Sequence, residues 1–144
     1  MGLTFTLAPS PQQSLLVVSN GGFLFSSNAV LGSQLGGSVN SALVVGAGSV
    51  WSNKNLLYIG GGDHDNRLIV SSGAALIVGG PTSLGTNAFA YASVATVTGP
   101  GSVWTNFGPL KIGDSSAGNS LVVSNGARLE SFRRISRIQR NRQQ

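Results

Sequence analysis

The sequence GAGSVWSNKNLLYIG occupies residues 46–60, and a close variant of it, GPGSVWTNFGPLKIG, occupies residues 99–113. The two copies lie 53 residues apart, and the same offset relates Leu68 to Leu121 and Gly73 to Gly126. Self-similarity at a fixed period is the sequence signature of a repeat architecture. The recurring stretch therefore predicts a chain built from stacked copies of one structural unit.

The 53-residue unit is itself double, because ALVVGAGSVW at residues 42–51 aligns with SLVVSNGARL at residues 120–129. A smaller unit of about 26 residues results, and its five copies begin at Leu16, Leu43, Leu68, Thr96 and Leu121. The fifth copy stops halfway. In the fourth copy, threonines replace the Leu and Val of the other copies. An inward Val97 and a one-residue bulge in the two tryptophan-bearing copies would restore the alignment.

Each copy contains short Val, Leu and Ile segments that alternate with period two and are separated by Gly, Asn and Ser. A unit of this size with two or three short strands buries its apolar face only by stacking on its neighbours. The pattern predicts an all-β fold, a parallel β-helix (β-solenoid) of about five coils with strands about 4.8 Å apart. A propeller is the alternative, because the 53-residue double unit reaches the length of about 40 residues that a four-stranded blade needs.

The repeat also divides the chain. We expect an N-terminal lead-in or cap at residues 1–14, solenoid repeats at residues 15–131 and an Arg-rich tail at residues 132–144. No window approaches the roughly 20 apolar residues of a membrane-spanning helix, so no transmembrane segment is expected. The start, MGLTFTLAPSPQQ, has neither the basic region nor the apolar run of a signal peptide.

Stacking of the copies predicts two columns of aligned residues. The first is apolar and interior, and it contains Leu24, Trp51, Leu76, Trp104 and Leu129. The second contains the glycines Gly21, Gly48, Gly73, Gly101 and Gly126. A glycine at one position of every coil indicates a corner with positive φ or a close approach between neighbouring backbones. The tryptophans are therefore expected in the core, with a sugar-stacking platform as the alternative.

The stretch VTGPGSVWTNFGPLKIGDSSAGNSLVVSNGARLES, residues 97–131, resembles the repeat of bacterial autotransporter passengers and PEP-CTERM-associated exported proteins. A more divergent copy spans residues 44–76, and the resemblance covers roughly residues 15–131. It implies a β-solenoid segment of a surface-exposed or secreted protein, without catalytic residues to carry over. The chain departs from the family pattern in its short length, in the lack of an export signal and in its Arg-rich ending.

Composition restricts the chemistry that the chain can perform. Only 9% of the residues are charged, compared with roughly 25% in ordinary soluble domains. Cysteine is absent, which excludes disulfides and thiolate metal sites. The net charge of +5 belongs to the tail FRRISRIQRNRQQ, which holds five arginines, because four basic and four acidic residues cancel in residues 1–131.

The sequence GGGDHDN at residues 60–66 contains the one cluster of potential metal ligands, Asp63, His64 and Asp65. A cation is a weak interpretation, because the equivalent loop DSSAGN keeps neither His64 nor Asp65. Asp, Asn and Gly are also the residues that a polar turn requires. We therefore expect a turn, with no metal and no cofactor.

Catalysis by paired carboxylates needs two of them roughly 5–9.5 Å apart in distinct environments. Asp63 and Asp65 are the one pair that is close in sequence, and both lie in the expected turn. No nucleophile–base pair is visible either, because the chain has one His and no Cys. The sequence predicts that the protein is not an enzyme.

The tail offers two interpretations. Phe132, Ile135 and Ile138 at a spacing of three would line one side of a short helix that caps the last coil. A loose tail would instead leave the last strand edges exposed, and its arginines would bind polyanions weakly in a salt-dependent way.

The sequence as a whole favours a structural module of a bacterial surface or secreted protein that acts as scaffold, stalk or adhesin segment. The expected location is extracellular or on the cell surface, and self-association through the solenoid ends or binding of surface glycans are the expected partner types. A carbohydrate-binding or carbohydrate-cleaving β-helix is the alternative.

Overall fold

The computed structural model describes residues 4–7, 13–33 and 39–132, which form fifteen β-strands and no helix. The strands assemble into three parallel sheets of five strands each. Sheet A contains β1 (Thr4–Leu7), β4 (Asn28–Leu31), β7 (Leu57–Ile59), β10 (Thr82–Leu84) and β13 (Leu110–Ile112). Sheet B contains β2 (Leu15–Val18), β5 (Ser41–Val45), β8 (Arg67–Ser71), β11 (Val94–Thr98) and β14 (Ser120–Ser124). Sheet C contains β3 (Phe23–Ser26), β6 (Val50–Asn53), β9 (Ala75–Val78), β12 (Val103–Asn106) and β15 (Arg128–Ser131).

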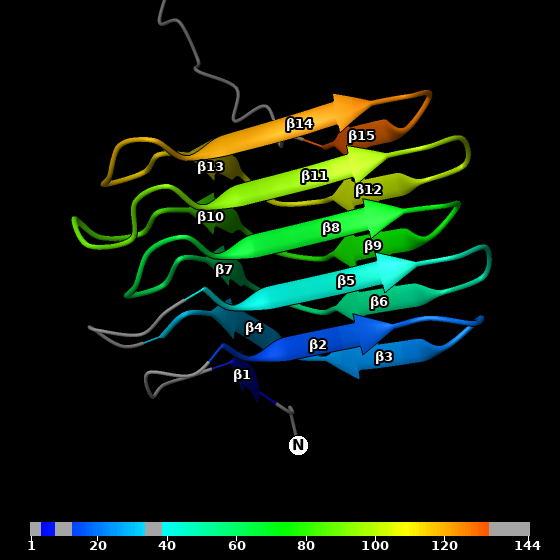
Figure 1. Cartoon of the computed structure of the whole chain (residues 1–144), viewed down its shortest axis with the longest axis horizontal. Coiled ribbons are helices and arrows are strands. Elements are labelled where there is room, and N and C mark those ends of the chain that lie inside the picture. The colour runs from blue at the N-terminus through cyan, green and yellow to red at the C-terminus, as the bar shows by residue number, and fades with distance from the viewer. Residues whose placement is uncertain (1–3, 8–12, 34–38, 133–144) are drawn as a thin grey trace, which may run out of the picture.

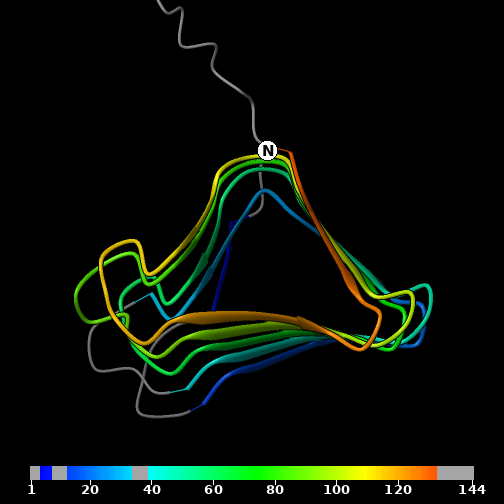
Figure 2. The same cartoon turned by 90° about the horizontal axis from the view of Figure 1, so that it is seen from above.

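Consecutive strands visit the three sheets in turn, so that each pass around the molecule adds one strand to every sheet (Figure 1). Viewed along the stacking direction, the chain traces a triangle with one sheet on each side (Figure 2). This is a three-sided parallel β-solenoid, which confirms the predicted fold class. The first strand, β1, lies inside the expected lead-in at residues 1–14 and pairs with β4 as a regular member of sheet A.

The register of sheet B corrects the alignment of two copies. Leu68 pairs with Ala42 on one side and with Ala95 on the other, so Leu43 and Thr96 point outward and do not begin the inward pattern. Val97 is fully buried, as the alternative alignment requires. The extra residue of the tryptophan-bearing coils lies in the turn between sheets B and C, not in a strand.

Spacing between inward residues shows where this extra residue is. Seven positions separate Val44 from Trp51 across the corner between sheets B and C, whereas six separate Val70 from Leu76 in the next coil. The double repeat of 53 residues therefore reflects two alternating forms of one corner, which we call the B–C corner.

The core is a stack of aliphatic layers around two indoles. Leu24, Trp51, Leu76, Trp104 and Leu129 are aligned in register across sheet C. Both indoles are fully buried. The glycines of the second predicted column, Gly21, Gly48, Gly73, Gly101 and Gly126, all take positive φ between 74° and 82° at the B–C corner. A side chain is strained in that conformation, which explains why the position recurs as glycine.

Candidate functional site

The corner between sheets A and B, which we call the A–B corner, carries the most variable loops of the solenoid. They are residues 60–66 between β7 and β8, residues 85–93 between β10 and β11, and residues 113–119 between β13 and β14. All three project from the same corner of the triangle (Figure 2). The GGGDHDN cluster lies in the first of them, so the candidate metal-binding and catalytic residues are at this corner.

A ladder of polar side chains ties successive coils together at the A–B corner. The Asn66 side-chain oxygen accepts the backbone N–H of Asn40, Ser93 Oγ accepts that of Asn66, and Asn119 Oδ1 accepts that of Ser93. Each bond crosses one coil spacing. The corner N–H groups of a buried turn would otherwise lack partners, at a cost of about 1–3 kcal/mol each. We call this series the corner ladder.

Asp63 is buried, with 2% of its surface exposed, and it accepts hydrogen bonds from Asn40 and Asn66 of the corner ladder. Its Oδ1 accepts Asn66 Nδ2 at 2.6 Å, and its Oδ2 accepts Asn40 Nδ2 at 3.3 Å. Desolvation by burial raises the pKa of this carboxyl above its usual range, and the amide hydrogen bonds and His64 oppose that shift. The carboxyl fits because Gly32 of the preceding coil has no side chain, and a Cβ there would overlap Asp63 Oδ1.

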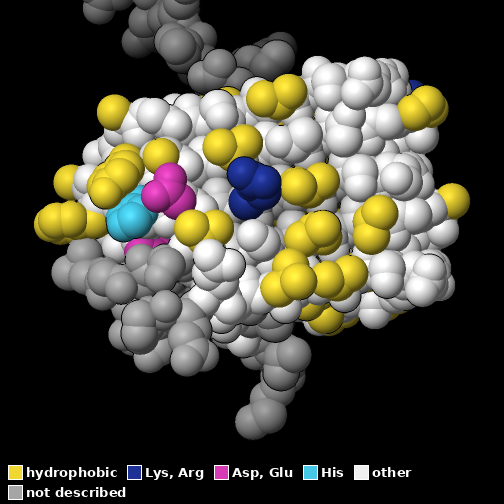
Figure 3. Space-filling model, in the orientation of Figure 1, with side chains coloured by type: hydrophobic (Ala, Val, Ile, Leu, Met, Phe, Trp, Pro, Cys, Tyr) yellow, Lys and Arg dark blue, Asp and Glu magenta, His cyan; other side chains and the backbone are white. Residues whose placement is uncertain are grey.

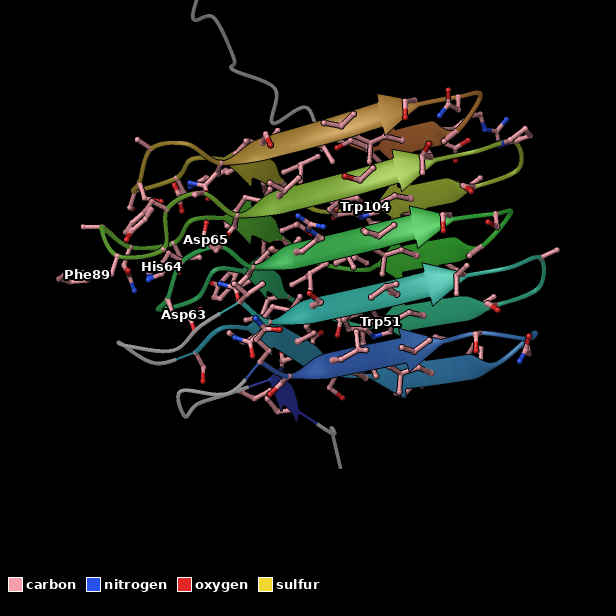
Figure 4. All side chains as sticks on the ribbon, in the orientation of Figure 1. Trp51, Asp63, His64, Asp65, Phe89 and Trp104 are labelled. Atoms are coloured by element: carbon pink, nitrogen blue, oxygen red, sulfur yellow. The ribbon has the colours of Figure 1, made fainter. Side chains whose placement is uncertain are left out.

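His64 and Asp65 face outward from the same loop. His64 Nδ1 lies 2.7 Å from Asp65 Oδ2, and the His64 ring stacks on Tyr91 of the next loop with centroids 4.8 Å apart. Tyr91 and Phe89 are 45% and 59% exposed. Figure 4 shows Phe89 at the outer tip of the loops, with His64 and Asp65 nearer to the strands. The corner thus presents an aromatic surface next to one histidine and one carboxylate.

The arrangement does not fit a metal centre. Asp63 turns inward to the corner amides, while Asp65 turns outward to His64. In the part of the chain that the structure describes, no three His, Cys, Asp or Glu side chains are placed to hold a metal ion. The expected polar turn describes these three residues better than a ligand set does.

Each of the four Asp and Glu side chains has a polar or charged partner. Asp63 binds corner amides, Asp65 lies against His64, Asp114 pairs with Lys111 at 3.2 Å and Glu130 pairs with Arg128 at 3.1 Å. These are all four carboxylates of the chain. Each of the four side chains is therefore held by a polar or charged partner of its own.

The tryptophans differ in one polar contact. Trp51 Nε1 donates to Ser26 Oγ at 2.9 Å, and Ser26 Oγ in turn donates to Asn53 Oδ1 at 2.7 Å. Two coils further on, Val78 stands at the position of Ser26, and Trp104 Nε1 is buried without a hydrogen-bond partner among the described residues. Full burial of both rings leaves no platform for a sugar (Figure 4).

Sequence reasoning missed the apolar outer faces. The central outward row of sheet B contains Val17, Leu43, Ile69, Thr96 and Val122. Figure 3 shows hydrophobic side chains spread over this face around a single basic group. On sheet C, Phe23 and Phe25 are 69% and 51% exposed at the first coil. The alternation of every strand would have located these rows once the correct inward residues of coils two and four were known.

Comparison of the chain with protein-family models, with curated proteins and with solved structures finds no match. Among the described residues, no helix has the length and apolarity that crossing a membrane requires. The Arg-rich tail beyond Phe132 lies outside the described residues, so the cap and the loose tail both stay predictions.

Proposed function

We propose that the chain is a structural β-solenoid module of a bacterial surface-exposed or secreted protein, where it serves as a scaffold, stalk or adhesin segment. The corner ladder is the observation that supports this most. Asn66, Ser93 and Asn119 are the polar residues that a functional loop would use, and each is bonded to the backbone of the preceding coil. Side chains used in this way stabilise an extended object and are not available for chemistry.

The surface composition points the same way. Outside the tail, the chain carries eight charged residues in 131, and the outward rows of sheets B and C contain only three of them, Arg67, Arg128 and Glu130, among mostly apolar or hydroxylated side chains. The resemblance of residues 97–131 to repeats of exported proteins supports a location outside the cell. An extended module of this kind holds other parts of a protein at a distance from the cell.

Protease treatment of intact cells tests the location. The gene is tagged in its own host, and the tagged protein is followed after protease is added before and after lysis, with a cytoplasmic enzyme as the protected control. Surface display predicts digestion in intact cells, and secretion predicts recovery from the medium. Protection in intact cells together with absence from the medium would refute the proposed location.

Glycan binding at the A–B corner is the second candidate, and two exposed aromatic residues favour it: Tyr91, which stacks on the His64 ring, and Phe89 in the same loop as Tyr91. Aromatic rings on a rigid support suit the apolar faces of sugars. A glycan array with the Tyr91→Ala variant tests it, and Phe107→Ala is the matched control because Phe107 is 50% exposed at a different corner. Binding that Tyr91→Ala abolishes and Phe107→Ala retains is the expected result, and an array without signal would contradict this candidate.

A further inference from the structure

The two ends of the described solenoid are flush. The strands run from β1 in sheet A to β15 in sheet C, so five complete turns leave one open strand edge per sheet at each end. At one end the open strands are β1, β2 and β3, and at the other they are β13, β14 and β15. Open parallel edges present rows of backbone N–H and C=O groups that can pair with another strand.

Among the described residues, the inward side chains of the last coil are less covered than those of the coils before it. In the inward column of sheet B, Val70 and Val97 are fully buried, whereas Val123 of the last coil is 41% exposed. In sheet A, Leu84 is fully buried and Ile112, the next residue in its column, is 47% exposed. Core side chains with this exposure need a cover of the same shape as one more coil.

We propose that this cover is the first coil of a second copy of the chain, stacked head to tail with β13, β14 and β15 of one copy paired in parallel with β1, β2 and β3 of the next. The register follows from the columns. Sheet B aligns Leu15, Ser41, Arg67, Val94 and Ser120, and the next residue in that series is Leu15 of the second copy. Sheet C aligns Phe23, Val50, Ala75, Val103 and Arg128, and it continues with Phe23 of the second copy.

The hydrogen bonds of the internal coils predict those of the junction. Arg67 N donates to Asn40 O at 2.8 Å, Val94 N donates to Asn66 O at 2.8 Å and Ser120 N donates to Ser93 O at 3.0 Å. The same step places the N–H of Leu15 of the second copy on Asn119 O. Ser14 occupies the corner position that Asn40 and Asn66 occupy in later coils, because Ser41 N donates to Ser14 O.

The outer faces of the two ends are complementary in chemistry. The described residues of the first coil, 4–7 and 13–27, include no charged residue, and Leu15 and Phe23 are 64% and 69% exposed there. At the other end, the Arg128 side chain is 69% exposed. Strand spacing of about 4.8 Å places the Phe23 ring of the second copy beside the Arg128 guanidinium, within the roughly 6 Å of a cation–π contact. Equivalent ends do not match in this way, which favours head-to-tail stacking over a two-fold dimer.

The test uses the full chain and two blocked variants. Phe23→Lys places a cation opposite Arg128 at the N-terminal edge, and Val122→Lys places one opposite Val17 at the C-terminal edge. Phe89→Lys is the matched control, because Phe89 is 59% exposed in the β10–β11 loop of the fourth coil and lies on neither end strand. Retained tryptophan emission and circular dichroism show that each variant is folded, since Trp51 and Trp104 lie in the core.

Sedimentation velocity as a function of concentration gives the result. The wild type and Phe89→Lys should form dimers and longer linear species, while Phe23→Lys and Val122→Lys should each lose at least about tenfold in association constant. An equimolar mixture of the two blocked variants should form a dimer that grows no further, because each supplies the end that the other lacks. A wild type that stays monomeric, as a covering tail at residues 133–144 would produce, would overturn the proposal. So would a Phe23→Lys variant that associates like the wild type, or a mixture that stays monomeric. The stacking does not depend on whether the chain is exported.

Discussion

Replacing the two buried tryptophans by phenylalanine separates packing from hydrogen bonding. Trp51 and Trp104 are both fully buried in the same column, and each lies between leucines. Trp51→Phe and Trp104→Phe therefore remove the same volume from similar surroundings. The polar contact is what distinguishes them, because Trp51 Nε1 donates to Ser26 Oγ whereas Trp104 Nε1 has no hydrogen-bond partner among the described residues.

The magnitude follows from that difference. Trp51→Phe loses a hydrogen bond with a net contribution of about 0.5–1.5 kcal/mol. Ser26 keeps its bond to Asn53, so the substitution leaves no new unpaired donor there. Trp104→Phe removes an unpaired buried N–H group, whose presence costs about 1–3 kcal/mol. Because the cavity costs are shared, Trp51→Phe should destabilise the protein by about 1.5–4.5 kcal/mol more than Trp104→Phe.

Urea unfolding measures the two free energies, followed by far-UV circular dichroism and by emission of the one remaining tryptophan. Val78→Thr is the converse experiment, because Val78 stands where Ser26 does and a hydroxyl there can accept the Trp104 N–H. It should raise the unfolding free energy in the wild type and lose this effect in Trp104→Phe. Equal costs for the two Trp→Phe variants, or a larger cost for Trp104→Phe, would refute the reasoning.

Three further predictions concern the corners. Burial raises the pKa of Asp63 above its ordinary value of about 3.8. Protonation of this carboxyl therefore stabilises the folded protein below that pH, and the stabilisation is lost as pH rises through the folded-state pKa. Asp63→Ser, which copies Ser116 of the last loop, should remove this fall in stability above the ordinary pKa of about 3.8, and thermal melts whose pH dependence stays parallel to that of the wild type would contradict it. Gly85→Ala should cost about 1–3 kcal/mol more than Gly21→Ala in urea melts. Both have φ near +74°, but a Cβ at Gly85 meets Ser116 Oγ and lies 2.9 Å from Ala90 O, whereas one at Gly21 meets nothing within 4 Å; equal costs would show that φ alone decides. Millimolar calcium or EDTA should leave the melting temperature unchanged, whereas an ion at a hundredfold excess over its Kd would stabilise the fold by about 2.7 kcal/mol.

The fold was predictable because its information is periodic. Short alternating strands and glycines recur at a fixed spacing, and the alternation in every copy indicates which residues face inward. The error in the alignment of Leu43 and Thr96 arose because the B–C corner accepts one residue more in alternate coils. An insertion in a turn shifts the apparent phase of the strand before it, although the inward residues keep their places.

The candidate site was less predictable, because its geometry depends on residues one coil away. The cluster of Asp63, His64 and Asp65 was visible in the sequence, but the opposite directions of its two carboxylates were not. Asp63 turns inward because Gly32, 31 residues earlier, leaves room and because Asn40 supplies an amide. Tyr91, which stacks on His64, comes from the following coil. Contacts between coils at an irregular corner have no local sequence signature.

The alternation of the B–C corner explains why the repeat is 53 residues long and not 26. In the first and third coils the glycine N–H groups of Gly21 and Gly73 donate to Ser49 Oγ and Ser102 Oγ of the coils that follow. Those serines stand in the coils with the longer corner, where one residue separates two positive-φ glycines (Gly46 and Gly48, Gly99 and Gly101), whereas in the shorter corners the two positive-φ residues are adjacent, as in Asn20 and Gly21. Every second coil therefore has a serine whose hydroxyl accepts a hydrogen bond from the coil before it. Ala74 and Ala127 stand at the same position in the coils between. Corner length and this hydroxyl therefore alternate together, which gives the sequence a period of two coils.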